Sequence, residues 1–234
     1  GVLEDLGNWR PISLLSVIYK LYSGVLTKRL ETIIEKISSN CQKGYSKRKR
    51  IHDSLINIFE LINICNSNNL DMIIIAIDFK KAFDSIDFGF LFKSLKFFNF
   101  GDTFINLIKT ALNNRKACII TGNGFTPNFD INQGCPQGDR LSPYLFIIAV
   151  EILLIKIELS PNIENIVLTD FPAKSKTEAF ADDITVTIKA TEENLINLKE
   201  ILVHFGAISG LHINVEKNKV MLITNTNDLF IEMN

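Results

Sequence analysis

The amino-acid sequence predicts an α+β fold in which an antiparallel sheet is backed by helices. Three observations favour this class. A run of apolar residues with the length of a strand, Met72 to Ile77, is rich in isoleucine and suits a strand buried on both faces. Residues 178–188 alternate between apolar and polar side chains in their second half, which is typical of a hairpin strand. Helical and strand-like segments also follow one another without a strict βαβα repeat.

The first third of the chain contains two expected helices and the first strand. Residues 16–37 carry apolar side chains at helical spacing and predict one helix. Asp53 is expected to be the N-cap of a second helix that runs to Cys65, and the polar segment 66–69 should end it. The strand then stops at Asp78.

The middle of the chain predicts two more helices and a hairpin. The helices cover residues 88–98 and 102–113 and are separated by Gly101. Residues 116–131 contain two strand-like segments on either side of Asn123-Gly124, which is a typical hairpin turn.

The last part begins with a strong helix start, in which Ser142 is the N-cap and Pro143 the first helical residue. The helix that follows is apolar almost all round and should be buried. The hairpin at 178–188 turns at or near Asp182-Asp183. Thr191 should then cap another helix, which Gly210 ends, and residues 212–223 add a strand.

Composition places the chain among globular proteins. It has 234 residues, of which 47% are hydrophobic, so it can bury a sizeable core. The longest apolar stretch, Tyr144 to Ile157, contains Glu151 and Lys156, which favours a buried core helix over a membrane span. The four cysteines form no CxxC pair, which fits a reduced compartment such as the nucleus or cytoplasm. The net charge of −1 argues mildly against nucleic-acid binding, although residues 47–50 form a basic run.

Two expected strands end in carboxylates. Asp78 follows the apolar strand, and Asp182 lies at the hairpin turn. If the two strands are neighbours, both side chains face one gap, where hard oxygen ligands hold Mg²⁺. Two such ions about 4 Å apart activate an attacking hydroxyl and stabilise the leaving group in phosphoryl transfer. The alternative for each acid taken alone is an ordinary turn residue or helix cap.

Six segments, in this order along the chain, carry a resemblance to one family. They are Asn8-Trp9-Arg10-Pro11-Ile12-Ser13-Leu14, Gln42-Lys43-Gly44-Tyr45 with Ile51-His52-Asp53, Asp78 to Asp84, Gln133 to Pro143, Phe180-Ala181-Asp182-Asp183, and Ser209 to Asn214 with Lys217. They resemble the NWRPISL, QxGF, DxxKAFD, QGxxxSP, [FY]xDD and SGLxIN…K motifs of reverse transcriptases of non-LTR (LINE-type) retrotransposons. The acidic box has Phe180 where Tyr is commoner. The resemblance covers about residues 8–222.

This resemblance implies the palm of a right-hand polymerase with helical fingers. Residues 1–70 would belong to the fingers, with a basic loop at 42–53, and residues 71–223 would form the palm with an inserted fingers portion. Residues 224–234 read as a polar tail, truncated before a thumb, so we expect a piece of a longer polypeptide. The implied function is an RNA-directed DNA polymerase, a nucleotidyltransferase that uses an RNA template, a DNA primer, dNTPs and two Mg²⁺ ions, with Mn²⁺ as a substitute. Its partners would be endonuclease and thumb regions of the full-length protein, and no membrane.

The resemblance also implies roles for individual residues. Asp78, Asp182 and Asp183 would be the catalytic and metal-binding carboxylates. Phe83 would be the steric gate that favours deoxynucleotides, with core packing as the alternative, and Gln137 and Gly138 would lie under the incoming base and template. Further nucleotide-binding candidates are Lys217, Lys49 and Arg10, and the nucleic-acid-binding candidates are Lys47, Arg48 and Arg50. For Lys217 the alternative is a solvated side chain, and for Arg10 a structural salt bridge.

Several other functions stay open at this point. An inactive or truncated retroelement remnant, acting as a nucleic-acid-binding or interaction module, is the main alternative, although all three carboxylates remain. The first and last motifs argue against a group II intron maturase and a telomerase. Phe83 argues against an RNA-dependent RNA polymerase. A Mg²⁺-dependent nuclease would not need the segment from Gln133 to Pro143.

Overall fold

A computed structural model describes residues 12–46, 49–166, 175–224 and 229–231. These residues fold around a five-stranded sheet with the order β6-β7-β1-β8-β9. The central strand β1 (Met72–Ile77) pairs antiparallel with β7 (Asp183–Lys189) and β8 (Lys219–Ile223). The outer strands, β6 (Thr177–Phe180) and β9 (Leu229–Ile231), are also antiparallel to their neighbours. The predicted α+β class with an antiparallel sheet is confirmed.

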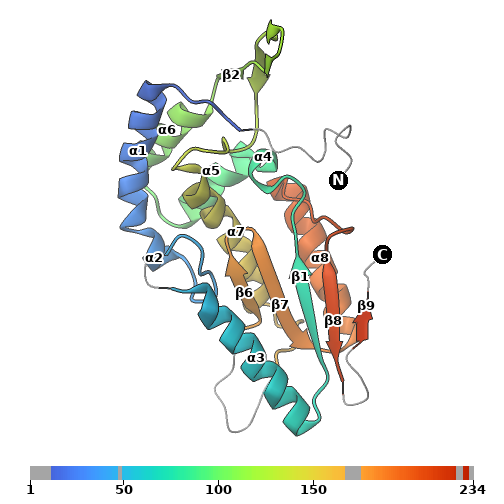
Figure 1. The fold of residues 1–234 in the computed structure, drawn as a ribbon. Coiled ribbons are helices and arrows are strands. Elements are labelled where there is room, and N and C mark those ends of the chain that lie inside the picture. The colour runs from blue at the N-terminus through green and yellow to red at the C-terminus, as the bar shows by residue number, and fades with distance from the viewer. Residues whose placement is uncertain (1–11, 47–48, 167–174, 225–228, 232–234) are drawn as a thin grey trace.

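Helices cover both faces of the sheet, which explains why β1 reads as a continuous apolar run. Ile73, Ile75 and Ile77 join the main core, which also contains residues of α7 (Ser142–Glu158) and α8 (Glu192–Ser209). Met72 and Ile74 point to the opposite face, where they pack with side chains of α3 (Ile51–Asn68). Figure 1 shows α3 crossing one face of the sheet and α7 and α8 lying behind the other. Alternate β1 residues therefore meet two apolar layers.

The helix α7 is buried along most of its length, as its apolar sequence predicts. Its start differs by one residue from the prediction. Leu141 is the N-cap and Ser142 is the first helical residue. The hydroxyl of Ser142 donates to the carbonyl oxygen of Pro136 at 2.8 Å, so it fixes the preceding loop instead of capping the helix.

The single helix expected over residues 16–37 is two helices, α1 (Val17–Glu31) and α2 (Ile34–Ile37). The break coincides with three consecutive β-branched residues, Thr32, Ile33 and Ile34, whose restricted side chains weaken a helix. The Thr32 hydroxyl also donates to the Arg29 carbonyl oxygen at 2.8 Å, at the end of α1.

The helix α3 begins two residues before the predicted N-cap. Asp53 is the third helical residue, and its carboxylate accepts a hydrogen bond from the backbone N–H of Arg50 at 3.2 Å. This is the carboxylate half of a capping box. The helix also runs past the expected stop and ends at Asn69, which adopts a left-handed conformation with φ of 54°.

Two helices of the middle region lie where the sequence predicts them, namely α5 (Phe88–Phe97) and α6 (Asp102–Leu112). A short helix that was not predicted, α4 (Ala82–Ser85), precedes them.

The predicted hairpin consists of two short ladders. In the outer one, β3 (Ile120–Thr121) pairs with β4 (Gly124–Phe125), and Thr121 lies opposite Gly124. The turn is therefore Gly122-Asn123, one residue before the predicted pair. The inner ladder joins β2 (Arg115–Ala117) to β5 (Phe129–Ile131).

The C-terminal elements follow the sequence closely. Thr191 caps α8 and accepts from the N–H of Asn194 at 3.2 Å, and Gly210 ends the helix with φ of 76°. The strand expected at 212–223 is shorter, because residues before Lys219 form a turn. Part of the expected polar tail, Leu229–Ile231, forms the edge strand β9. No helix of the described residues is long and apolar enough to cross a membrane.

Candidate active site

Asp78 lies at the end of the central strand and is held by the turn that precedes β8. Asn218 is buried, and its Oδ1 atom accepts the backbone N–H of Asp78 at 2.9 Å. The backbone N–H of Asn214 donates to the Asp78 carbonyl oxygen at 2.7 Å, and its side-chain Nδ2 lies 3.4 Å from the carboxylate. The backbone of Asp78 is therefore fixed by residues more than 130 positions away in the sequence.

Lys217 belongs to the same turn and contacts the same carboxylate. Its Nζ atom lies 3.9 Å from Oδ2 of Asp78. The lysine side chain is 69% exposed, so this ion pair contributes little to stability. The contact does place a positive charge beside Asp78 and next to solvent. Two residues that the sequence selected separately are thus neighbours.

The other two acids lie on the neighbouring hairpin, in a segment from Phe180 to Asp183 that we call the acidic turn. Phe180 pairs with Asp183, so Ala181 and Asp182 form the tip. The β1–β7 register ends with Ile77 opposite Ile184, and continuing it by one residue sets Asp78 opposite Asp183. The two strands are therefore neighbours, which is the condition under which the sequence places Asp78 and Asp182 at one gap.

The three carboxylates are close along the backbone, but their side chains are not gathered into one cluster. Among the described residues, no group of three or more His, Cys, Asp or Glu side chains is arranged to hold a metal ion. The donors themselves suit Mg²⁺, because carboxylate oxygens are its preferred protein ligands. Asp78 and Asp182 are half-buried and Asp183 is exposed, so solvent and substrate oxygens can complete a coordination shell. Their assignment as metal ligands stays a prediction.

A second loop packs against the chain that follows Asp78. The backbone N–H groups of Gly134 and Cys135 donate to the carbonyl oxygens of Ile86 at 2.9 Å and Phe83 at 2.7 Å. Gln137 donates from Nε2 to the Asp84 carboxylate at 2.9 Å. Burial raises the pKa of Asp84, and the hydrogen bond from Gln137 opposes that rise. The loop thus fixes the position of the segment that carries Phe83.

Gly134 makes this contact close. Its φ is +81°, and a Cβ atom there would lie 2.6 Å from the carbonyl oxygen of Asp84. Only glycine combines that conformation with such an approach of two backbones.

Phe83 and Gly138 have different surroundings. The half-buried ring of Phe83 packs on Phe146, with ring centroids 4.8 Å apart. This contact agrees with core packing and leaves the steric-gate role a prediction. Gly138 is exposed and has φ of +99°. A Cβ atom there would come no closer than 3.7 Å to Ser13, the nearest neighbour, so Gly138 is needed for its conformation more than for space.

A buried polar contact lies beneath the same loop. The Asp139 side chain is buried and accepts a hydrogen bond from the Tyr19 hydroxyl at 3.1 Å. Burial, together with the charge of Asp139, raises the pKa of Tyr19. Burial also raises the pKa of the neighbouring Cys135 thiol to about 12, which makes it an inert packing residue.

Of the predicted basic ligands, only Lys49, Arg50 and Lys217 lie among the described residues. The Nζ atom of Lys49 donates three hydrogen bonds, to Ser38 O at 3.2 Å, Ser38 Oγ at 3.2 Å and Ser39 O at 2.6 Å. Burial lowers its pKa. In this conformation its ammonium fixes the chain after α2, and its role as a nucleotide ligand stays a prediction. Arg50 is exposed at the start of α3. Arg10, Lys47 and Arg48 lie outside the described residues.

Three amide side chains of the site were not selected from the sequence, namely Gln42, Asn214 and Asn218. Gln42 and Asn214 lie within recognised motif segments, and Asn218 follows Lys217 directly. The available signal was an amide in a short polar segment next to a strand. That signal does not say which distant backbone group the amide contacts.

Comparison with known proteins agrees with the motifs. The family model for "Reverse transcriptase (RNA-dependent DNA polymerase)" matches residues 4–229. The chain is 26% identical over 222 residues to the Transposon TX1 uncharacterized 149 kDa protein of Xenopus laevis. The match covers 95% of this chain and 17% of that protein. It is 30% identical over 225 residues to the Retrovirus-related Pol polyprotein from type-1 retrotransposable element R2 of Popillia japonica, covering 93% and 30%. The chain thus spans less than a third of these curated relatives.

The fold also has solved counterparts. A structure of apo telomerase from Candida tropicalis, truncated from the C-terminal domain, superposes with a TM-score of 0.60. The match covers 90% of this chain and 45% of that one at 13% sequence identity. At this identity the likeness concerns the fold alone.

Proposed function

This chain belongs to the reverse transcriptase (RNA-dependent DNA polymerase) family, and from that premise we propose that it extends a DNA primer on an RNA template as part of a non-LTR retrotransposon protein. The observation that carries this proposal is that Asp78, at the end of β1, lies next to the acidic turn at the start of β7. Such a pair of strand ends presents carboxylates to one region of solvent.

In this proposal the three acids share one task. Asp78 and Asp182 would hold Mg²⁺ directly, and Asp183 would support them. When bound, two Mg²⁺ ions supply positive charge for the attacking 3′-hydroxyl and the departing pyrophosphate. Asn214 and Asn218 hold the Asp78 backbone, so its carboxylate needs little reorganisation when substrate arrives.

The remaining residues would orient the nucleotide. Lys217 lies beside Asp78 and is exposed, so its ammonium can meet a phosphate of the triphosphate as a point charge. Gln137 and Gly138 would line the place of the incoming base, and Phe83 would exclude a 2′-hydroxyl. Gln137 holds Asp84 and thereby steadies the segment that carries Phe83. The other candidates for contacts with phosphates are Arg10, Lys47, Arg48, Lys49 and Arg50.

Primer extension tests this function. The substrates are an RNA template, an annealed DNA primer, dNTPs and Mg²⁺, with Mn²⁺ in a parallel series. We expect extension by the wild-type chain and none above background for Asp182→Asn. The matched control is Asp102→Asn, an exposed acid in the first turn of α6, which should extend like the wild type. Circular dichroism should show the same fold in all three.

The outcomes separate the main alternatives. Extension by Asp182→Asn at the wild-type rate would contradict the role of the acidic turn. A folded wild-type chain that binds primer and template but extends nothing, with either metal, would support an inactive binding module instead.

A further inference from the structure

The side chain of Gln42 is fully buried beside the acidic turn, at 0% exposure. Its Oε1 atom accepts two backbone N–H groups, from Gly44 at 2.8 Å and from Ala181 at 3.0 Å. Its Nε2 atom donates to the carbonyl oxygen of Ala181 at 3.5 Å. One amide thus contacts both backbone polar groups of Ala181, the residue directly before Asp182.

Ala181 needs such support because of its conformation. Its φ is +57°, in the left-handed region that residues with a Cβ atom rarely adopt. Ala181 is also buried, so water is not available to take over its backbone hydrogen bonds. If the amide of Gln42 were lost, a return of Ala181 to an ordinary backbone conformation would lower its conformational free energy, and Asp182 would move with it.

The segment that carries Gln42 is itself attached to the hairpin. The backbone N–H of Lys43 donates to Ala179 O at 2.7 Å, and the N–H of Ala179 donates to Cys41 O at 2.9 Å. Gly44 leaves no free space, because a Cβ atom there would lie 2.5 Å from the backbone nitrogen of Ala181. Residues 41–44 therefore lie alongside strand β6 and end against the tip of the acidic turn.

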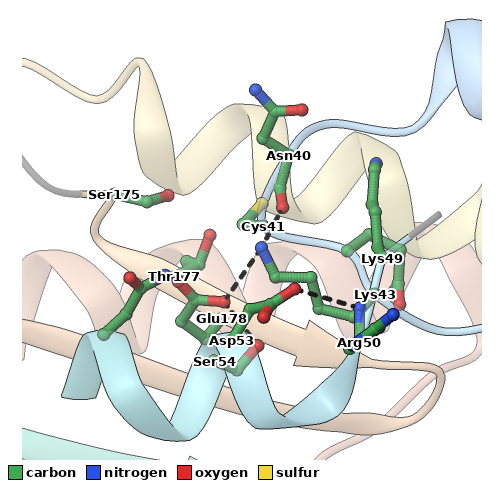
Figure 2. A network of polar contacts seen from close by, with 12 residues as sticks. Asn40, Cys41, Lys43, Lys49, Arg50, Asp53, Ser54, Ser175, Thr177 and Glu178 are labelled. Carbon is green, nitrogen blue, oxygen red and sulfur yellow. Dashed lines mark hydrogen bonds and ion pairs between the residues drawn. The ribbon is translucent and has the colours of Figure 1, made fainter. Parts of the chain in front are cut away.

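Buried polar contacts fix the same segment from the side of α3. The carboxylate of Glu178 on β6 accepts hydrogen bonds from Ser54 at 2.6 Å and Asn57 at 2.7 Å. The ammonium of Lys43 lies 3.7 Å from Glu178 and donates to Asn40 O at 2.6 Å. Figure 2 shows Lys43 between Asn40 and Glu178, with Ser54 on the adjoining helix. The support for Gln42 thus comes from α3 and β6 together.

We propose that Gln42 is a positioning residue for nucleotidyl transfer, which holds Ala181 in its left-handed conformation and so fixes the Asp182 carboxylate. This inference rests on the proposed polymerase function. It assigns to residues 41–44 a contact with the acidic turn.

The first test combines hydrogen exchange with kinetics. Gln42→Met keeps the length of the side chain and removes its hydrogen bonds. The control is Asn194→Leu, since Asn194 is equally buried and binds the backbones of Glu164 and Lys189 at the other end of β7. Gln42→Met should raise the exchange rate of the Ala181 amide at least tenfold relative to that of Thr187. Asn194→Leu should leave that ratio unchanged.

The kinetic readout separates positioning from general destabilisation. Per folded molecule, Gln42→Met should lower kcat for primer extension by about tenfold, or ~1.4 kcal/mol, and change the KM for dNTP less than twofold. Asn194→Leu should retain the wild-type kcat. Adding Ala181→Gly to Gln42→Met should recover part of kcat, because glycine adopts the left-handed conformation without the Cβ penalty. A merely structural role would not produce that rescue.

Each result decides something definite. If exchange at Ala181 does not change in Gln42→Met, the inference is overturned whether or not the protein is active. If exchange rises but kcat equals that of the control, Gln42 is only structural and the inference is again overturned. An inactive wild type would remove the polymerase premise, which is a separate failure. If Gln42→Met does not fold, Gly44→Ala is the second variant, because it displaces Ala181 from the other side and should give the same selective loss of kcat.

Discussion

Gly134→Ala is the substitution whose cost the structure defines best. The change adds one methyl group at a position with φ of +81°. A residue with a Cβ atom costs about 1–2 kcal/mol in the left-handed region. The methyl group would also lie 2.6–2.8 Å from three backbone atoms of Asp84, which cannot rotate away as a side chain would. Overpacking of this kind costs about 1–3 kcal/mol.

The two contributions together predict a loss of about 2–5 kcal/mol in the free energy of unfolding. Gly24→Ala is the matched control, since Gly24 lies inside α1 and a methyl group there would meet no heavy atom of a neighbouring element within 4 Å. There the same added methyl group should stabilise the protein by about 0.5–1 kcal/mol, because alanine is the better helix former.

Urea unfolding followed by circular dichroism measures both values on one scale. We expect the two glycine variants to change stability in opposite directions. If Gly134→Ala unfolds within about 0.5 kcal/mol of the wild type, the close approach between the loop and Asp84 does not exist in solution. A loss in both variants would show that the added methyl group itself, not its surroundings, determines the effect.

Three further substitutions test other parts of the site. Phe83→Ala should lower the free energy of unfolding by about 2–3 kcal/mol, which is less than the loss expected for a fully buried ring. It should also reduce the preference for dNTPs over ribonucleotides about tenfold or more. Unchanged selectivity in competitive extension would leave Phe83 a packing residue. Asn218→Ala should cost about 1–3 kcal/mol in urea unfolding, because it leaves the Asp78 N–H without its partner, and should lower kcat more than it raises KM. Burial raises the pKa of Glu151 above its ordinary 4.5, so the folded state binds a proton more tightly than the unfolded state and the wild type loses stability as pH rises from there. Glu151→Gln lacks this loss, so its stability relative to the wild type should increase as pH rises above 4.5 and should not depend on pH below that value. A stability difference that does not vary with pH in urea unfolding would refute this.

The sequence predicts features that depend on neighbouring residues and misses those that depend on distant partners. The strand at residues 72–77 and the cap at Thr191 were predicted because burial on both faces and helix capping leave local patterns. The break after Glu31 was missed because apolar spacing continues across it. The resemblance implies a nucleotide-binding role for Lys49, which stays a prediction, but its carbonyl partners at Ser38 and Ser39 could not be predicted because they depend on how the chain folds back.

The same distinction explains the candidate site. A carboxylate at the end of a strand is visible in the sequence, and so the acids were found. The amides that support them form contacts over 136 to 140 positions, from Asn214 and Asn218 to Asp78 and from Gln42 to Ala181. No periodic pattern encodes such a pair. The pairing of β1 with β8 brings Asn214 and Asn218 to Asp78, and a parallel bridge between Gln42 and Ala179 brings Gln42 to Ala181.

The motif segments without catalytic acids can therefore be understood as supports for those with them. The turn before β8 holds Asp78, the Gln133–Pro143 segment holds Asp84 and Phe83, and residues 41–44 hold Ala181 before Asp182. Each support contacts backbone or a neighbouring side chain, so its loss should disturb geometry more than affinity. Substitutions of supporting residues that are not proposed to face the nucleotide, such as Gln42 and Asn218, should then reduce kcat at nearly constant KM, whereas substitution of an exposed charge such as Lys217 should raise KM for the nucleotide. This difference follows from burial and contacts alone, and it distinguishes the two groups of residues in a single kinetic series.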